Sequence, residues 1–562
     1  MSFLQEPPRL GNQWQEDRAL RRLLTRRLPA DVLASIEPSL DQMGELAAGE
    51  LLTLSHESRA VLPEWIPFDA WGRHVDEIRV NDAWKRGRAL AAQAGLIATG
   101  YERAHGEHSR THQFALVYLF APSSQVYTCP LAMSDGASRT LETLADAELR
   151  DAVLPRLLSR DPARVWTSGQ WMTERIGGSD VGISETVAKR TPDGWRLYGV
   201  KWFTSAVTSE VALTLARPEG NGPGGKGLAL FLVHTRDEQG QPNHLRVLRL
   251  KDKLGTRSVP TAELELYGTP AILVGRASDG VRDMAAMLNL TRTWNAVCSA
   301  ASLRRGLALA RDYARRRVAF GALLSEKPLH LETLAALAAE QEAALQLTFH
   351  AVSLLGREEA GDLDESGHAV LRLLQPVAKL LTARQAVAGA SETLEAFGGA
   401  GYVEDTGLPE ILRDAQVLSI WEGTTNVLSL EAFRAVARAG ALAPFAAEVR
   451  ARAGTARAAG LLEPARQARA AADHAEKWWA AASQRGVAES EAGARRFAFT
   501  LGRSLALALL LEQAQWDLDR DGDGRTAEAS RRFAHSGVDL LQDEAGDPAA
   551  TARLALDEPV PG

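Results

Sequence analysis

The stretch Ser419-Ile-Trp-Glu-Gly-Thr-Thr-Asn426 is the most informative in this chain of 562 residues. It places a single carboxylate, Glu422, between a bulky aromatic residue and a glycine followed by two threonines. Partial burial disfavours the charged form of a carboxyl group, which suits a general base that works near neutral pH. A helix N-cap or a solvated loop acid is the commoner role of a glutamate beside glycine. Other segments decide between these two interpretations.

Composition and charge indicate a globular protein of more than one domain. Apolar residues make up 45% and charged residues 24%, and the net charge of −7 argues against a general nucleic-acid binder, although a local basic face stays open. The two cysteines, Cys129 and Cys298, lack metal-type spacing, so we expect no zinc or disulfide framework. The first ten residues do not resemble a secretory signal, and no apolar run reaches the ~18 residues of a membrane span. We therefore expect a soluble cytoplasmic protein.

Hydrophobic periodicity divides the chain into four segments. Residues 1–164 predict an N-terminal helical domain, and residues 165–278 predict strands joined by turns such as Thr191-Pro-Asp-Gly194. Residues 279–440 predict the long helices of a bundle, and residues 441–562 predict a helical extension rich in Ala and Arg. Helices grouped before and after one β-block, without βαβ alternation, favour a mostly helical α+β fold.

Four further segments carry chemical groups, each with a plainer alternative. Met172-Thr-Glu-Arg-Ile-Gly-Gly-Ser-Asp180 suits the polar edge and diphosphate of a cofactor, or is a simple turn. Lys201-Trp-Phe-Thr-Ser205 can stack on and hydrogen-bond a flavin-like ring, or holds a core tryptophan. Arg315-Arg-Arg-Val-Ala-Phe-Gly321 can pair with phosphate, or is a solvated helix face. Glu395-Ala-Phe-Gly-Gly-Ala-Gly-Tyr402 imitates a dinucleotide fingerprint, but no strand precedes it and a Rossmann fold is rejected.

The order of these motifs, with Lys253-Leu-Gly-Thr-Arg257 between them, closely resembles the acyl-CoA dehydrogenase family over about residues 80 to 435. Within the family the chain is most similar to the AidB branch of adaptive-response flavoproteins. The features behind this assignment are Ser419-Ile-Trp-Glu-Gly423, Leu250-Lys-Asp-Lys-Leu-Gly255, Arg79-Val-Asn-Asp-Ala-Trp84 and the extra C-terminal helices. The resemblance implies an N-terminal helical domain, a middle antiparallel β-domain and a four-helix bundle, with a helical tail domain, assembled as a homotetramer.

The resemblance also implies FAD and a set of site residues. Glu422 matches the catalytic base, and Arg292 matches an arginine near the thioester end of the substrate channel. Arg317 and Phe320 match a segment that a neighbouring subunit offers to FAD. The residues that match flavin contacts within one subunit are Met172, Thr173, Gly178, Ser179, Trp202, Thr204, Gly398, Gly399 and Thr424.

The implied reaction is the α,β-dehydrogenation of an acyl-CoA, with an electron-transfer flavoprotein as an expected partner. Removing the weakly acidic α-proton needs a carboxylate held close to it, while the flavin accepts hydride from the β-carbon. Three residues depart from catabolic members, namely Arg175 for Pro, Glu395 for Gln and Trp421 for Tyr. The larger Trp421 narrows the expected acyl channel, which favours a short or branched acyl-CoA.

The AidB resemblance implies an alternative function, namely a stress or alkylation-response flavoprotein that binds double-stranded DNA and has weak or no dehydrogenase activity. A scaffold with a vestigial site is a third interpretation. An excess of basic residues could face phosphates, although the tail from Asp517 is acidic and a solvated helix face explains the pattern equally well. These basic residues are Arg450, Arg452, Arg457, Arg466, Arg469, Lys477, Arg485, Arg495, Arg496 and Arg503.

One motif is independent of the family. Residues 517–528 fit the EF-hand loop pattern and predict a Ca²⁺ site, although Gly524 and Arg525 depart from it and an acidic connector between helices is the alternative. The expected ligands are Asp517, Asp519, Asp521, Asp523 and Glu528.

Overall fold

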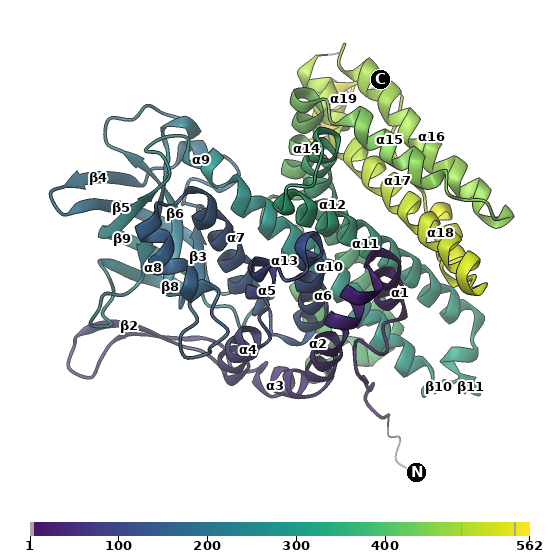
Figure 1. Cartoon of the computed structure of the whole chain (residues 1–562), viewed down its shortest axis with the longest axis horizontal. Helices are drawn as coiled ribbons and strands as arrows, with labels where there is room; N and C mark the ends of the chain where they lie inside the picture. Colours follow the sequence, from purple (N-terminus) through teal and green to yellow (C-terminus); the bar gives the residue numbers. More distant parts are fainter. Residues whose placement is uncertain (1–4, 485, 544–546, 562) are drawn as a thin grey trace. The chain divides into compact units, whose positions relative to one another are not determined.

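Residues 5–484, 486–543 and 547–561 are described by a computed structural model of the chain, shown in Figure 1. The chain forms two compact units, each built from two stretches of sequence. The first unit extends to Tyr313 and includes Ala390–Leu418, and the second comprises Ala314–Gly389 and the residues from Ser419 onward.

The N-terminal part of the first unit is largely helical, as predicted. Capping side chains stand where the sequence places Asp or Asn before an apolar run, because such oxygens satisfy the free N–H groups of a first helical turn. Asp17 accepts a hydrogen bond from Leu20 N at 2.9 Å, and Asn81 accepts one from Trp84 N at 2.9 Å. The helices are α1 (Arg18–Arg27), α2 (Ala30–Ala48), α3 (Glu50–Ser58), α4 (Asp82–Gln93), α5 (Ala98–Glu102), α6 (Ser109–Phe120), α7 (Thr128–Leu144) and α8 (Ala147–Leu157).

One β-hairpin interrupts these helices, which the sequence analysis did not predict. Strands β1 (Glu64–Phe68) and β2 (His74–Arg79) pair antiparallel. The buried Asp76 holds the hairpin, accepting hydrogen bonds from Trp65 Nε1 and from Val247 N, both at 2.8 Å. Val247 belongs to the middle β-domain, so this carboxylate fixes the hairpin against the sheet.

The middle β-domain is a seven-stranded sheet with the order β3-β6-β4-β5-β9-β7, in which β8 pairs with β9 and β6 also pairs with β7. The pairings are antiparallel, as predicted, except β3–β6 and β4–β6, which are parallel. A bulge between Lys201 and Thr204 interrupts the pairing of β5 with β9. Bulges change the direction in which neighbouring side chains point. The strands are β3 (Ser168–Trp171), β4 (Val187–Thr191), β5 (Gly194–Ser205), β6 (Val211–Pro218), β7 (Ala229–His234), β8 (Leu245–Leu250) and β9 (Thr261–Val274).

The rest of the first unit is helical. It contains α9 (Gly280–Asp283), the long α10 (Ala285–Ala314) and α13 (Leu408–Leu418). Helix α10 is tied to α7 through Trp294, whose Nε1 donates to the fully buried Asp135 at 2.7 Å.

The second unit is a helical assembly with one small hairpin. The helices between residues 442 and 535 share one hydrophobic core with α11, α12 and α14, and Figure 1 shows α16 and α17 running side by side. Its elements are β10 (Val318–Ala319), β11 (Ala322–Leu323), α11 (Pro328–Ala360), α12 (Glu365–Ala396, whose last residues belong to the first unit), α14 (Thr425–Ala439), α15 (Leu442–Ala453), α16 (Ala459–Ala482), α17 (Val487–Asp521), α18 (Arg525–His535) and α19 (Pro548–Ala555).

Helix α17 is the one helix in the described part of the chain that is long and apolar enough to cross a membrane. However, 89% of its most apolar window is buried inside the protein, as expected of a core helix. Helices α11, α14, α15, α16 and α18 all contact it.

The predicted fold class, mostly helical α+β with one middle β-domain, is confirmed. The predicted boundaries at residues 164, 278 and 440 fall in connections between elements. Helices group at both ends of the chain because their apolar residues recur at helical spacing, whereas the strands lie where this period changes to two.

Candidate functional site

The expected base, Glu422, lies immediately before helix α14 in the second unit. Its φ angle is +57°, and that of Gly423 is +104°. A left-handed backbone is uncommon for a residue with a side chain, and such strain concentrates at functional sites. Glu422 is half-buried, and the indole N–H of Trp421 beside it is buried without a hydrogen-bond partner among the described residues. The segment therefore holds one acid in a strained turn next to an unsatisfied donor.

Thr424, one of the predicted flavin contacts, is also the N-cap residue of helix α14 and so has a structural role. Its Oγ1 accepts a hydrogen bond from Val427 N at 3.4 Å, and its side chain is exposed. The N-terminus of a helix favours negative charge nearby. Glu422 precedes this cap by two residues in the sequence.

Arg292, the second expected catalytic residue, lies in the first unit on α10. It is buried, with 7% of its surface exposed. One turn further along this helix, Asn295 donates from Nδ2 to Leu418 O at 3.1 Å and so fixes the last residue of α13. Helix α10 thus carries an expected catalytic residue and an anchor for the helix that precedes the Glu422 segment.

The expected flavin loop follows strand β3. Gln170 and Met172 lie on the same face of the chain, with Nε2 of Gln170 at 3.3 Å from Met172 Sδ. Oε1 of Gln170 is buried and has no hydrogen-bond partner in the described chain. A Cβ atom on Gly178 would lie 2.5 Å from Oγ1 of Thr173, so the loop folds back tightly and needs glycine there. Ser179 next to it is exposed. Sequence reasoning missed Gln170, although its place two residues before Met172 on a strand was a usable signal.

A buried ion pair joins this loop to strand β5. Lys201 is fully buried and donates to Glu174 Oε1 at 2.7 Å and to Leu215 O at 2.8 Å. Beside it, Trp202 N donates to Thr173 O at 2.9 Å. Burial alone raises the pKa of Glu174, but the charge and hydrogen bond of Lys201, together with the hydrogen bonds from Thr186 and from Glu185 N, lower that pKa below its ordinary value. The ion pair therefore lies next to the backbone hydrogen bond that joins two expected flavin contacts, Thr173 and Trp202.

Trp202 and Thr204 have different surroundings on β5. The ammonium group of Lys251 lies 3.5 Å from the ring centroid of the half-buried Trp202, and Nζ of Lys251 also pairs with Glu263 at 2.6 Å. Thr204 is fully buried, and its hydroxyl donates to Ala262 O at 2.7 Å. The predicted hydrogen bond from this hydroxyl to a flavin would have to replace or share that bond.

Among the remaining expected flavin contacts, Gly398, Gly399 and Phe320 are exposed. A Cβ atom on Gly398 or Gly399 would meet nothing within 4 Å, which leaves that backbone open to a ligand. In the second unit, Arg317 precedes the β10–β11 hairpin and is half-buried, whereas Phe320 at its turn is 98% exposed. The expected residues thus divide into a group in the first unit and a group comprising Arg317, Phe320, Glu422 and Thr424 in the second.

A cluster of half-buried ionisable groups surrounds the Lys253–Arg257 motif in the first unit. Asp414 accepts a hydrogen bond from Thr256 N at 2.5 Å, and Glu410 accepts one from Gln125 Nε2 at 3.1 Å. Burial and the charge of Asp414 raise the pKa of Glu410 to about 7. Burial lowers the pKa of Lys253 to about 8. Sequence reasoning treated this motif only as a family marker and missed the two acids on α13.

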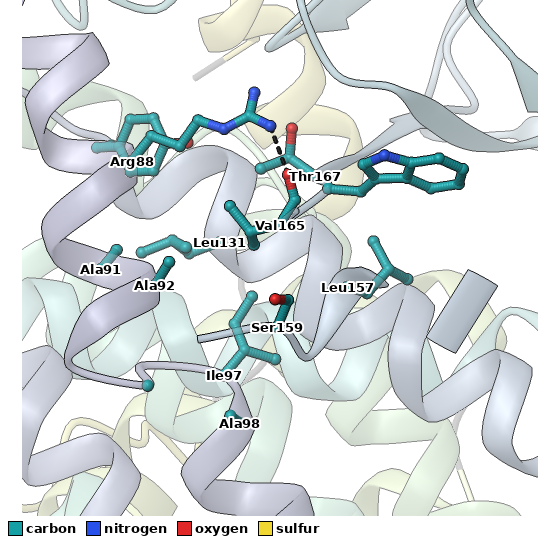
Figure 2. A pocket seen from close by; sticks show the side chains of 13 residues that line it. Arg88, Ala91, Ala92, Ile97, Ala98, Leu131, Leu157, Ser159, Val165 and Thr167 are labelled. Atoms are coloured by element: carbon teal, nitrogen blue, oxygen red, sulfur yellow. Dashed lines mark hydrogen bonds between the residues drawn. The ribbon is translucent and has the colours of Figure 1, made fainter. Parts of the chain in front are cut away.

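The cavity in Figure 2 is too small for a cofactor or an acyl chain. Its volume is about 20 Å³, which is room for roughly one water molecule. Arg88 beside it donates from Nη2 to Val165 O at 2.5 Å and pairs with Glu210 at 2.7 Å. This cavity is therefore a packing gap near β3.

The predicted Ca²⁺ site is wrong. Helix α17 continues to Asp521 and α18 begins at Arg525, so the twelve residues do not wrap around one point. Asp517 is fully buried and accepts a hydrogen bond from Thr526 Oγ1 at 2.6 Å. The described residues contain no group of acids, His or Cys that could hold a metal ion. Ion pairs engage other expected ligands, as Asp519 pairs with Arg457 and Glu528 with Arg532. Asp523 accepts a hydrogen bond from Arg525 N, at the start of the next helix, at 3.1 Å.

Acidic neighbours neutralise much of the basic excess in the tail. Arg452 pairs with Glu448 and Glu512, and Arg503 pairs with Glu340. Arg450, Arg457 and Arg466 are also in ion pairs, and Arg485 lies outside the described residues. Paired cations contribute less to binding a phosphate backbone, because each has a competing carboxylate.

Family models match nearly the whole chain in order. Residues 5–162 match the adaptive response protein AidB N-terminal domain, and residues 169–268 match the acyl-CoA dehydrogenase middle domain. Residues 278–437 match the acyl-CoA dehydrogenase C-terminal domain, and residues 440–553 match the acyl-CoA dehydrogenase 11 C-terminal domain-like model.

Individual relatives agree with these models. The chain is 45% identical to acyl-CoA dehydrogenase family member 11 of Caenorhabditis elegans over 77% of this chain and 72% of the relative. It is 33% identical to AidB of Escherichia coli (strain K12) over 75% of this chain and 78% of that protein. The crystal structure of Caenorhabditis elegans ACDH-11 in complex with C11-CoA superposes with a TM-score of 0.95 at 38% identity, covering 99% of this chain and 96% of that one. This chain therefore belongs to the acyl-CoA dehydrogenase family, in its AidB-like branch.

Proposed function

We propose that this protein is an FAD-dependent acyl-CoA dehydrogenase in which Glu422 removes the α-proton of the acyl thioester. The observation that carries the proposal is the left-handed backbone of Glu422, in a motif that matches the family's base. A fold retains such strain where the position of the side chain is worth its cost, of the order of 1–3 kcal/mol. A solvated loop acid would gain nothing from it.

The chain's polar groups fit a flavin. Gln170 offers a buried carbonyl oxygen without a partner, and Gly398 and Gly399 leave open backbone. A flavin ring carries N–H and carbonyl groups at its polar edge, so it could satisfy such an acceptor. Met172, Thr173, Gly178, Ser179 and Trp202 would hold it, and bound FAD would supply the hydride acceptor.

The chain's own residues would prepare the substrate for this step. The carboxylate of Glu422 would take the α-proton, while the buried Arg292 would orient the thioester end. Family membership supports these roles, and the buried indole N–H of Trp421 adds an unsatisfied donor next to the base. In this reaction the α-carbon would lose a proton to Glu422, and the β-carbon would lose a hydride to the acceptor that bound FAD would supply.

The worm relative's complex with C11-CoA supports an acyl chain of medium length for this protein as well. The wide indole of Trp421, in contrast, supports the short or branched acyl-CoA expected from the sequence. A panel of thioesters from short to medium length separates these two substrate classes. The preferred length is the one with the fastest flavin reduction.

Assembly and partners belong to the same proposal. Phe320 at a hairpin turn is 98% exposed, as expected for a side chain that a neighbouring copy buries in a homotetramer. An electron-transfer flavoprotein would then reoxidise the flavin. Mass measurement in solution tests the tetramer, and reduction of the partner flavoprotein tests the electron acceptor.

Anaerobic addition of acyl-CoAs to the FAD-loaded protein tests the proposed activity. Thioesters that are substrates should bleach the visible flavin spectrum, and Glu422→Gln should slow bleaching by about 10³-fold, since positioned general bases contribute about 10²–10⁴-fold. Glu392→Gln, an exposed acid outside the proposed site, is the control and should react normally. An unbleached wild-type protein across the panel would discard the dehydrogenase, and salt-titrated binding to a random-sequence duplex would then test the DNA-binding alternative.

A further inference from the structure

Lys379 is a buried cation that the proposed reaction has not used. It lies on α12 in the second unit with 0% of its surface exposed. Its Nζ donates a hydrogen bond to Gly423 O at 2.7 Å. Gly423 directly follows Glu422, and both residues belong to the same unit as Lys379. One ammonium group therefore contacts the backbone of the turn that carries the expected base.

A buried ammonium group is costly unless it is hydrogen-bonded, so its position is informative. The contact fixes the direction in which the Gly423 carbonyl points, and with it the orientation of the Gly423–Thr424 peptide, which begins one residue after Glu422. The turn is tight from the other side too, since a Cβ atom on Gly423 would lie 2.9 Å from Leu428 Cδ2. Two left-handed residues in succession would otherwise relax towards commoner backbone angles.

We infer that Lys379 is a positioning residue that holds the Glu422–Gly423 backbone in its left-handed turn and so aims the Glu422 carboxylate. Lys379 does not itself touch the acyl group in this inference, and it acts through the peptide. The inference rests on the proposed function for its catalytic consequence, although the contact with the turn stands on the structure alone.

A structural role in the helix bundle is the competing explanation, and α12 offers a matched control for it. Thr382 lies on the same helix, is also fully buried, and its hydroxyl donates to Ala378 O at 2.7 Å within α12. Thr382→Val removes a buried hydrogen bond without touching the turn. Lys379→Met removes the ammonium group while keeping a long side chain, and Lys379→Arg restores a cationic donor.

The first measurement is the kinetics of the FAD-loaded protein. Lys379→Met should slow flavin reduction at saturating acyl-CoA by about 10²-fold, because a misplacement of the reacting groups by about 1 Å costs this much. Binding of a non-oxidisable 3-thia-acyl-CoA should change less than about threefold, since the pocket is intact. Lys379→Arg should recover much of the rate, and Thr382→Val should react at the wild-type rate. Added to Glu422→Gln, Lys379→Met should cost almost nothing further, because both act on one group.

The second measurement does not need catalysis. In the cofactor-free protein, amide hydrogen exchange across residues 419–427 should be faster in Lys379→Met than in the wild type, and close to wild type in Lys379→Arg. If Lys379→Met does not fold, Lys379→Gln replaces it, with a neutral donor in place of the charge. Wild-type rates together with wild-type exchange would overturn the inference. A wild-type protein that no acyl-CoA bleaches would discard the proposed function alone, and the exchange data would still decide whether Lys379 holds the turn.

Discussion

Lys201 and Lys379 are both fully buried lysines beside expected site residues, yet each donates a hydrogen bond to a different kind of group. Lys201, in the first unit, pairs with Glu174 and links the expected flavin loop to the strand of Trp202. Lys379, in the second unit, donates to the carbonyl of Gly423 next to the expected base. The first contact joins two opposite charges, whereas the second aims a cation at a backbone dipole. The difference suggests that one lysine fixes where the cofactor binds and the other how the base is presented.

The largest expected effect comes from breaking the ion pair. Lys201→Met should leave Glu174 buried without its cation and should destabilise the first unit by about 3–5 kcal/mol, as the loss of one partner of a buried pair does. The protein should also lose FAD readily, since the loop of Thr173 would lose the ion pair beside its backbone hydrogen bond to Trp202. Thermal unfolding and the flavin content after gel filtration measure both effects.

A double variant separates the charge from the packing. Lys201→Met combined with Glu174→Gln removes both charges and should recover much of the lost stability, because no uncompensated ion remains. If Lys201→Met alone unfolds at the wild-type temperature and retains FAD, the contrast drawn between the two lysines is mistaken. Lys379→Met, in comparison, should keep its FAD and lose rate.

The fold was predictable because the period of the apolar residues changes where the architecture changes. The hairpin of β1 and β2 was not predicted, because its strands are short and Pro67 stands within the first of them. The Ca²⁺ loop was mistaken because five acidic positions matched a pattern, while the packing of α17 in the core extends its helix through Asp521. At residues 517–528, tertiary packing therefore decides the structure in place of the local sequence pattern.

The candidate site was predictable only where motifs are contiguous. Glu422 and the Met172–Asp180 loop stand out as strings of residues, whereas Gln170 and Lys379 do not. A single lysine in the apolar helix α12 resembles a solvated side chain, and nothing in the sequence indicates its contact with Gly423. Such contacts join residues far apart in the chain, so only the folded structure reveals them.

The next largest expected effect concerns Glu410, an acid in the first unit whose surroundings disfavour its charged form. Burial and Asp414 raise the pKa of Glu410 from 4.5 to about 7, opposite to the shift of Glu174. The folded state therefore holds this proton more tightly than the unfolded state, so the free energy of unfolding should fall as pH rises from about 4.5 to about 7. Glu410→Gln should lessen this fall, to which Asp414 with its pKa raised to about 6 also contributes, and should be more stable than wild type at pH 8 by about 1–2 kcal/mol. Urea unfolding at pH 5 and pH 8 measures it, and an unchanged slope with pH would contradict the assignment.

The smallest expected effect concerns the acids of residues 517–528, whose carboxylates have protein partners in place of a metal ion. A Ca²⁺ ion bound only to the folded state would add about 2.7 kcal/mol at 100 times its dissociation constant, and for a domain of this size each kcal/mol raises Tm by about 2–4 °C. We expect instead that Tm in millimolar Ca²⁺ and in EDTA agrees within about 1 °C. Asp517→Ala should lower Tm equally in both, because this carboxylate accepts the hydrogen bond of Thr526 and has no ion to lose. A Tm that rises with Ca²⁺ in the wild type but not in Asp517→Ala would restore the metal site and show that the helical end of α17 rearranges to bind it.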